Sequence, residues 1–375
     1  MTVLLQTCGT PCAKPLRRRQ ALRRAGTDTV TSFSNGKVKK PMKIFIQEIK
    51  ENENVDSFFL VREKSSGLTK NGNIYLRLKL GDRSGEIEGR IWTFVETFSE
   101  SFERDDFVHV KGKAVSFQGQ LQISVNQIER VGEEGIELSD FFPKTEKNID
   151  DMLNSLMEIS QQVKNPYLHR LLHLFWEDNP FLDRFKIAPA SKWIHHNYLG
   201  GLLEHTLSLA ELVIENSSHY KGLNLDLLLA GSILHDLGKI DELSYRRSLD
   251  YSDEGRLLGH ITLGIEMIED KIRQIPDFPK ALATLVKHLI LSHHGQDIWG
   301  SPKKPMTLEA VMLHFLDDMD AKINGIQQFL KVQLPEGSKW SSYHRTFDQF
   351  FYVSTGWEQP EPADKVAENE PEEAK

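Results

Sequence analysis

Residues 233–239 read Ile233-Leu234-His235-Asp236-Leu237-Gly238-Lys239 and set a histidine beside an aspartate in an apolar segment. Adjacent side chains on a helix project about 100° apart. His235 can therefore bind one cation while the oxygens of Asp236 bridge to a second. We expect Gly238 to end the helix in the left-handed conformation that glycine accepts, and His293-His294-Gly295 repeats that arrangement.

Further histidines and aspartates continue this pattern in both directions along the chain. Imidazole nitrogens and carboxylate oxygens suit divalent manganese, iron, cobalt, nickel or zinc. Buried His and Asp side chains without partners are costly, and a metal cluster removes that cost. The ordered series is His205, His235-Asp236, His260, His293-His294 and Asp317. We expect six further histidines to be ordinary core or surface residues: His109, His169, His173, His219, His288 and His344.

Helical periodicity runs through residues 148–353 and predicts an all-α bundle. Asn165-Pro166 marks a break after the first of these helices. The predicted helices are Asp150–Lys164, Tyr167–Trp176, Leu199–Glu215, Leu225–His235, Leu258–Ile272, Phe278–Ser292 and Thr307–Leu330.

Residues 43–131 show a different pattern, rich in β-branched and aromatic residues and punctuated by glycine turns. Several short strands in one compact segment predict a small closed barrel, and the OB-fold is the leading candidate. The predicted strands are Val55–Glu63, Asn73–Leu80, Glu86–Trp92, Phe107–Phe117 and Gln120–Ile128.

The second predicted strand turns Tyr75, Arg77 and Lys79 to one face, because side chains alternate along a strand. An aromatic ring beside two cations suits single-stranded nucleic acid, since the ring stacks on a base and the cations meet phosphates. An ordinary solvated strand face is the alternative interpretation. Trp92 and Phe117 can join this nucleic-acid-binding platform, with core packing as their alternative.

The composition of the 375-residue chain, with 39% hydrophobic and 27% charged residues, is that of a globular protein of two or three domains. No run of 18 apolar residues occurs, so we expect no membrane span. Cys8 and Cys12 are the two cysteines, which excludes a disulfide framework or a zinc ribbon. These features together predict a cytoplasmic protein.

Charge is spread unevenly along the chain. Residues 1–41 hold nine Lys or Arg against one acid, although the net charge of the whole chain is −8. A basic tail can hold nucleic acid, but we favour a disordered extension ahead of Met42, where the hydrophobic pattern begins. The predicted organisation is multidomain: a basic disordered extension over 1–41, an all-β OB-fold barrel over 42–135, an all-α helical bundle over 148–355 and an acidic disordered tail over 358–375.

The order His…His-Asp…Asp resembles the HD superfamily of metal-dependent phosphohydrolases, and the added histidines at 260, 293 and 294 resemble its binuclear branch. A longer run, which follows the predicted OB-like barrel in this chain, is similar to the YhaM family of 3′→5′ exoribonucleases. That run is His195-His196-Asn197-Tyr198-Leu199-Gly200-Gly201-Leu202-Leu203-Glu204-His205-Thr206. The resemblance covers residues 42–355, and the basic extension departs from it.

The resemblance implies a role for each matching residue. Four residues match the four-residue core of the superfamily and would hold a first metal: His205, His235, Asp236 and Asp317. Three more would hold a second metal, with Asp236 bridging the two: His260, His293 and His294.

Other positions of the HD segment would act beside the metals. Lys239 matches a lysine that often follows the His-Asp pair and would contact phosphate. His195 and His196 would line the substrate channel, with surface histidines at a helix start as the alternative. Asp320 lies close to Asp317 in sequence, and we expect it to be structural.

The implied function is that of a metal-dependent hydrolase, a 3′→5′ exoribonuclease that releases nucleoside 5′-monophosphates from single-stranded RNA, with single-stranded DNA left open. Two divalent ions, Mn²⁺ favoured over Fe, Co, Ni or Zn, would acidify a water molecule and clamp the phosphoryl oxygens. A hydrolase of a small nucleotide (a cyclic dinucleotide or a nucleoside triphosphate) and a non-catalytic RNA-binding scaffold are the alternatives. The resemblance also suggests a homo-oligomer.

Overall fold

The computed structural model describes residues 43–69, 71–132, 134, 136–192, 196–245, 249–335 and 337–354. The predicted basic extension, the predicted acidic tail and His195 lie outside these residues.

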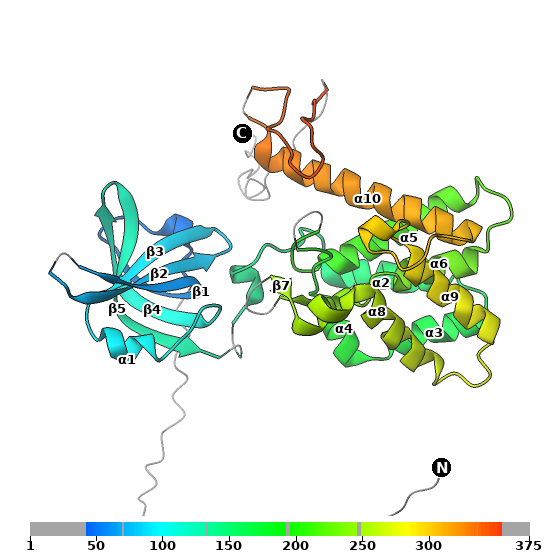
Figure 1. The fold of residues 1–375 in the computed structure, drawn as a ribbon, viewed down its shortest axis with the longest axis horizontal. Coiled ribbons are helices and arrows are strands. Elements are labelled where there is room, and N and C mark those ends of the chain that lie inside the picture. The colour runs from blue at the N-terminus through cyan, green and yellow to red at the C-terminus, as the bar shows by residue number, and fades with distance from the viewer. Residues whose placement is uncertain are drawn as a thin grey trace, which may run out of the picture. The chain divides into compact units, whose positions relative to one another are not determined.

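Five strands close into a barrel in the order β1-β2-β3-β5-β4, with β3 and β5 paired in parallel (Figure 1). The strands are β1 (Asn54–Leu68), β2 (Ile74–Asp82), β3 (Gly85–Ile91), β4 (Phe107–Phe117) and β5 (Gln120–Val131), preceded by the turn η1 (Ile46–Glu48). The short helix α1 (Val95–Ser99) connects β3 to β4. All five predicted strands are present, and the predicted OB-fold barrel is confirmed.

Strand β1 runs five residues beyond its predicted end at Glu63. The segment Lys64–Leu68 is mostly exposed and lacks the apolar alternation that marks a buried strand. Its backbone pairs with β2 instead, from Lys64 opposite Leu78 to Leu68 opposite Ile74. Backbone pairing with a neighbour therefore extends the strand where the side-chain pattern gives no signal.

The alternation along β2 sorts its side chains as predicted. Leu76, Leu78 and Leu80 are buried in the barrel core, whereas Arg77 and Lys79 are exposed and Tyr75 is half-buried. Phe59 and Ile123 lie fully buried on the opposite walls of this core. The outer face of β2 is therefore available to a ligand.

The second half of the chain is helical, as predicted (Figure 1). Its helices are α2 (Ile149–Ser160), α3 (Pro166–Trp176), α4 (Asn179–Phe185), α5 (Gly201–Ser217), α6 (Leu225–Leu234), α7 (Lys239–Glu242), α8 (Asp253–Ile272), α9 (Lys280–Ser292) and α10 (Leu308–Gln333). The smaller elements are the turns η2 (Leu138–Asp140) and η3 (Asp297–Trp299) and the two-stranded pair β6 (Leu243–Ser244) and β7 (Asp250–Tyr251). The sequence periodicity missed α4 and α7 because one or two turns are too short to show it.

Helix α6 is the centre of this bundle. Every residue of it from Leu227 to Leu234 is buried, so it is apolar all round and packs against α5, α9 and α10. A helix with this pattern belongs in a core. Its C-terminal end carries His235 and Asp236 into the interior.

Gly238 does not adopt the left-handed conformation that we expected. Its φ is −62° and its ψ is −16°, which are right-handed helical values. A Cβ at this position would overlap the backbone carbonyl of His260 and the backbone nitrogen of Gly264. Glycine is needed for close packing of α7 against α8, and the prediction of a left-handed cap is wrong. Gly295 has φ +78°, so the corresponding prediction there is confirmed.

Helix α8 contains a kink that the sequence did not predict. Gly259 has φ +74° and ψ +157° inside the helix, which only glycine adopts without strain. The kink separates the first turns after Ser252 from the segment that we predicted to begin near Leu258. His260 stands directly after the kink, where its backbone N–H is free of the helix ladder and donates to Glu242 Oε1 over 2.9 Å.

Among the described residues, no helix combines the length and the apolar character needed to cross a membrane.

Replacing Gly238 by alanine should destabilise the protein by about 1–3 kcal/mol, because the added methyl group forces backbone atoms of α7 and α8 apart. Gly132→Ala is the matched control, since a Cβ there meets nothing within 4 Å and its φ is not positive. Urea unfolding of both variants measures the difference. A Gly238→Ala protein as stable as the control would contradict this packing argument.

Candidate metal centre

Four predicted ligands converge at one buried point, although they come from different parts of the chain. His205 lies on α5, Asp317 lies on α10, and His235 and Asp236 follow α6. The Nε2 atoms of His205 and His235 are 3.2 Å apart. Asp317 Oδ1 is 3.2 Å from His205 Nε2, and Asp236 Oδ2 is 3.2 Å from His235 Nε2. We call these residues the first group.

Hydrogen bonds on the opposite side of each ring fix this orientation. His205 Nδ1 lies 2.8 Å from Asp320 Oδ2, and His235 Nδ1 lies 2.8 Å from the carbonyl oxygen of Ser232. Both oxygens only accept, so each Nδ1 carries a proton and donates it. The Nε2 atoms of the two rings then face each other across 3.2 Å, an arrangement that is repulsive unless a proton or a metal cation lies between them.

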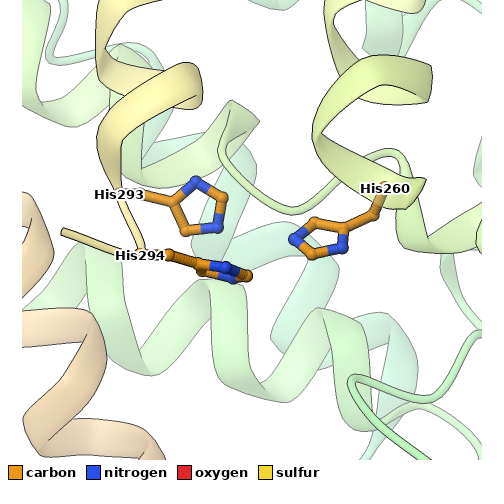
Figure 2. A group of neighbouring side chains, drawn as sticks. All are labelled: His260, His293 and His294. Carbon is orange, nitrogen blue, oxygen red and sulfur yellow. The ribbon is translucent and has the colours of Figure 1, made fainter. Parts of the chain in front are cut away.

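Three further histidines form a second group, which consists of His260 on α8 and His293 and His294 at the end of α9. Figure 2 shows the three rings turned toward one another. One potential ligand atom from each ring lies within 4.8 Å of those of the other two. The Nδ1 atom of each ring again has a hydrogen-bond partner. These partners are Glu242 Oε1 at 2.9 Å for His260, the Ile290 carbonyl at 2.7 Å for His293 and the Trp299 carbonyl at 2.8 Å for His294.

Asp236 connects the two groups. Its Oδ2 faces the first group, whereas its Oδ1 lies 3.5 Å from His260 Nε2 and 3.5 Å from His293 Nε2. Among the described residues, these three atoms are buried without a hydrogen-bond partner. Leaving a buried polar atom unpaired costs about 1–3 kcal/mol. A divalent cation would satisfy all three, so the residues present fit a metal in both groups.

The electrostatics of the first group favour positive charge. Burial alone would lower the pKa of His205, but hydrogen bonds with Asp317 and Asp320 outweigh it and raise the pKa to about 9. Burial would raise the pKa of Asp236, but Lys239 and His235 hold it well below its usual range. The group therefore attracts a proton in the absence of a cation, and a divalent ion would replace that proton.

The second group is electrostatically different. Burial lowers the pKa of His293, and burial together with His293 and His260 lowers the pKa of His294 to about 3. Neutral imidazoles are the form that binds metal. His293 and His294 thus offer neutral nitrogen donors and His260 adds a third ring nitrogen, whereas the first group offers two nitrogens and two carboxylates.

Lys239 lies beside the bridging carboxylate, as the sequence led us to expect. Its ammonium group is buried and donates to Asp236 Oδ2. Burial would lower the pKa of Lys239, but the Asp236 carboxylate outweighs this and raises it. The amine stays charged next to both groups.

His196 lies near the Nδ1 side of the His205 ring and not near its Nε2 atom, which faces the other ligands. Its Nδ1 lies 2.7 Å from Tyr198 Oη, and its Nε2 lies 3.9 Å from Asp320 Oδ2. Asp320 is the residue that accepts from His205 Nδ1, and it also accepts from Ser208 Oγ over 2.6 Å. These contacts fit the structural role expected for Asp320. His196 stands behind the first group, where it can position Asp320, and this placement does not favour the substrate contact that we predicted for it.

Sequence reasoning missed Glu242, which holds His260 twice. Its Oε1 accepts from the backbone N–H and from the ring Nδ1 of His260, each over 2.9 Å. The contact depends on the packing of α7 on α8 and on the kink at Gly259. The separation of 18 residues gives no spacing signal that could have identified it.

On the barrel, Tyr75 stacks on Trp92 with ring centroids 4.9 Å apart. Arg90, which sequence reasoning missed, lies over both rings at 5.7 Å and over Phe117 at 5.1 Å. Arg77 donates to Glu88 over 2.8 Å, and Arg90 donates to the same carboxylate. Lys79 pairs with Glu86 over 2.7 Å. The aromatic cluster of Tyr75, Trp92, Phe117 and Arg90 thus lies on the outside of the barrel beside two paired cations.

Comparison with known families agrees with both halves of the fold. The profile described as the HD domain matches residues 202–322, a range that contains both groups of candidate ligands. The profile described as an OB-fold nucleic acid binding domain matches residues 60–131. The chain combines an OB-fold domain with an HD domain. HD domains are metal-dependent phosphohydrolases, which supports a hydrolase.

Solved structures similar to this chain include the second OB-fold domain of replication protein A from Methanococcus maripaludis. That match has 26% identity and a TM-score of 0.21, and covers 26% of this chain and 100% of that one. The single-stranded DNA binding protein from Thermus aquaticus matches at 20% identity with a TM-score of 0.20, over 22% of this chain and 40% of that one.

Glu242→Gln should weaken cation binding at the second group by about 10- to 100-fold, because the amide holds the His260 ring less firmly and makes it a poorer donor. The first group should keep its affinity. Titration with Mn²⁺ against a chelating dye measures both sites, and Glu266→Gln, an exposed glutamate on α8, is the control. Two unchanged affinities would contradict the role assigned to Glu242.

Proposed function

We propose that this protein is a metal-dependent 3′→5′ exoribonuclease that shortens single-stranded RNA to nucleoside 5′-monophosphates. The observation that carries the proposal is the convergence of the two groups on Asp236, whose Oδ1 faces His260 and His293 while its Oδ2 faces His235. An OB-fold nucleic-acid-binding domain in the same chain favours a polymeric substrate over a small nucleotide.

We assign the ligands of the centre as the resemblance to the HD superfamily implies. His205, His235, Asp236 and Asp317 would hold one divalent cation, and His260, His293 and His294 would hold a second that shares Asp236. When bound, two such cations neutralise phosphoryl oxygens and acidify a water molecule, with Mn²⁺ the favoured ion. The first group, with its two carboxylates, provides the harder donor set.

The residues of the chain orient and stabilise the scissile phosphate. Lys239 keeps a full positive charge in a buried position, where its field is only weakly screened. In the reaction water adds to the phosphorus of the terminal phosphodiester and the bond to the 3′-oxygen of the shortened strand breaks. The phosphate leaves on the released nucleotide, and the 3′-oxygen takes up a proton. Lys239 counters the negative charge that develops on the phosphoryl oxygens.

The barrel would hold the strand through stacking and charge. Trp92 and Phe117 are each about half exposed, with relative exposures of 44% and 47%. Rings of this kind accept any base, because every base has a π face. Arg90, Arg77 and Lys79 supply cations around them, although acidic neighbours compensate part of their charge.

Wild-type protein with Mn²⁺ should release labelled mononucleotides from a 3′-labelled single-stranded RNA. His235→Ala and Asp236→Asn should each lower the rate by roughly 10³-fold, since charge stabilisation worth several kcal/mol is lost. His219→Ala, an exposed histidine of the same bundle, is the control. If His235→Ala and Asp236→Asn were as active as the His219→Ala control, the proposed function would be wrong. The same assay with a single-stranded DNA substrate measures the preference for ribose or deoxyribose.

Trp92→Ala should weaken binding of single-stranded RNA about 5- to 150-fold, the range expected for loss of one stacked base. Arg90→Ala should also reduce the slope of affinity against salt concentration by about one. Fluorescence anisotropy in an Asp236→Asn background, which keeps the RNA intact, measures both effects. Tyr220→Ala removes an exposed ring from the helical domain and should change neither. Unaltered binding by Trp92→Ala would exclude the aromatic cluster.

A further inference from the structure

The metal centre opens to solvent on one side. The side chains of His205, His235 and His293 are fully buried and that of Asp236 is 3% exposed, whereas Asp317 is 15% and His260 is 11% exposed. His294 is also partly exposed. A substrate phosphate must therefore approach along the side that Asp317, His260 and His294 border.

Trp299 lies in the loop that follows the second group and is bonded to one of its partly exposed ligands. Its backbone carbonyl accepts from His294 Nδ1 over 2.8 Å. Its ring lies 6.1 Å from the ring of His314 and 5.8 Å from Lys322 Nζ. These two residues of α10 precede and follow Asp317 by three and five positions, so the ring packs on the α10 segment that contains this ligand, on a neighbouring face of the helix.

The loop that carries Trp299 is firmly held. Gly295 has φ +78° and packs so closely on the His314 ring that a Cβ would overlap it, and Gly300 has φ +84° at the end of η3. Ser301 is buried and donates to the carbonyl of Leu291 over 3.1 Å. The Trp299 ring is nevertheless 46% exposed. It is a large aromatic surface in a preorganised position with nothing of the described chain covering its outer half.

Other exposed apolar residues near this loop do not have the same placement. Phe315 is 64% exposed, but it is a residue of α10 itself and not of the loop whose backbone is bonded to His294. Ile298 is 82% exposed but offers no ring. Trp299 thus bonds to the ligand His294 through its backbone and places its ring beside the α10 segment that contains Asp317.

We propose that the Trp299 ring stacks on the base of the 3′-terminal nucleotide and so holds the last phosphodiester at the metal centre. This inference rests on the proposed function and assigns it a substrate-positioning residue. Stacking recognises a base without reading its identity. An enzyme that removes successive nucleotides of any sequence needs a contact of this kind at its terminal subsite.

Trp299→Ala should raise KM for single-stranded RNA about 5- to 150-fold with a smaller effect on kcat, and Trp299→Phe should restore most of the loss. Both variants keep the backbone carbonyl that holds His294, and their metal content checks this. Trp340→Ala, a 55% exposed tryptophan outside this loop, is the matched control. On RNA whose terminal nucleotide lacks its base, wild type and Trp299→Ala should have equal KM values. An unchanged KM for Trp299→Ala on intact RNA, or an equal loss on the abasic substrate, would overturn the proposal.

Binding of the product separates this proposal from the proposed function. Adenosine 5′-monophosphate should bind wild type more tightly than ribose 5-phosphate does, and Trp299→Ala should remove that difference. If wild type releases no nucleotides from RNA but shows this difference, the exoribonuclease assignment fails while the stacking site stands. If Trp299→Ala binds adenosine 5′-monophosphate as wild type does, the stacking site fails whatever the activity.

Discussion

The direction of five imidazole rings is the constraint on which the functional half of the molecule depends. Each ring donates its Nδ1 proton backward, two of them to the carboxylates of Asp320 and Glu242 and three to backbone carbonyls. All five Nε2 atoms are left facing the spaces between the ligands of the two groups. Nitrogen lone pairs gathered in this way repel one another, so the arrangement is satisfied by positive charge, either a proton or a metal cation. Asp236 supplies negative charge to both spaces and makes them one centre.

The helices produce this direction through their ends. His235 and His293 each stand directly after the last residue of a helix, and each ring bonds the carbonyl three residues earlier in that helix. The last carbonyls of a helix have no partner within it, so each ligand satisfies a helix end and is oriented by it. Because α6 is buried on all sides, its end cannot shift without disturbing the core. Packing of apolar residues thus fixes the position of the polar ones.

Sequence reasoning identified the barrel, the bundle and the seven residues that converge in two groups, because spacing on helices and alternation on strands are local properties. It failed where tertiary contacts decide. Gly238 was expected to be left-handed, but its role comes from the carbonyl of His260, 22 residues further along the chain. Glu242, Arg90 and Trp299 carry no local signal, since each acquires its neighbours only when separate elements pack together. The proximity of His196 to Asp320 could not be predicted either, because Asp320 lies on α10, far along the chain.

Cation binding and folding are linked in such a centre. The folded chain keeps Asp236 Oδ1, His260 Nε2 and His293 Nε2 buried without hydrogen-bond partners among the described residues, which opposes folding. A cation that binds these atoms removes the opposition and stabilises the folded state in proportion to its own affinity and concentration. The two groups also share a carboxylate, so a cation in one reduces the negative charge that Asp236 presents to the other. Occupancy of the two groups would therefore be coupled through a single side chain. The two cations would bind with unequal affinities, since the first group alone has a second carboxylate in Asp317.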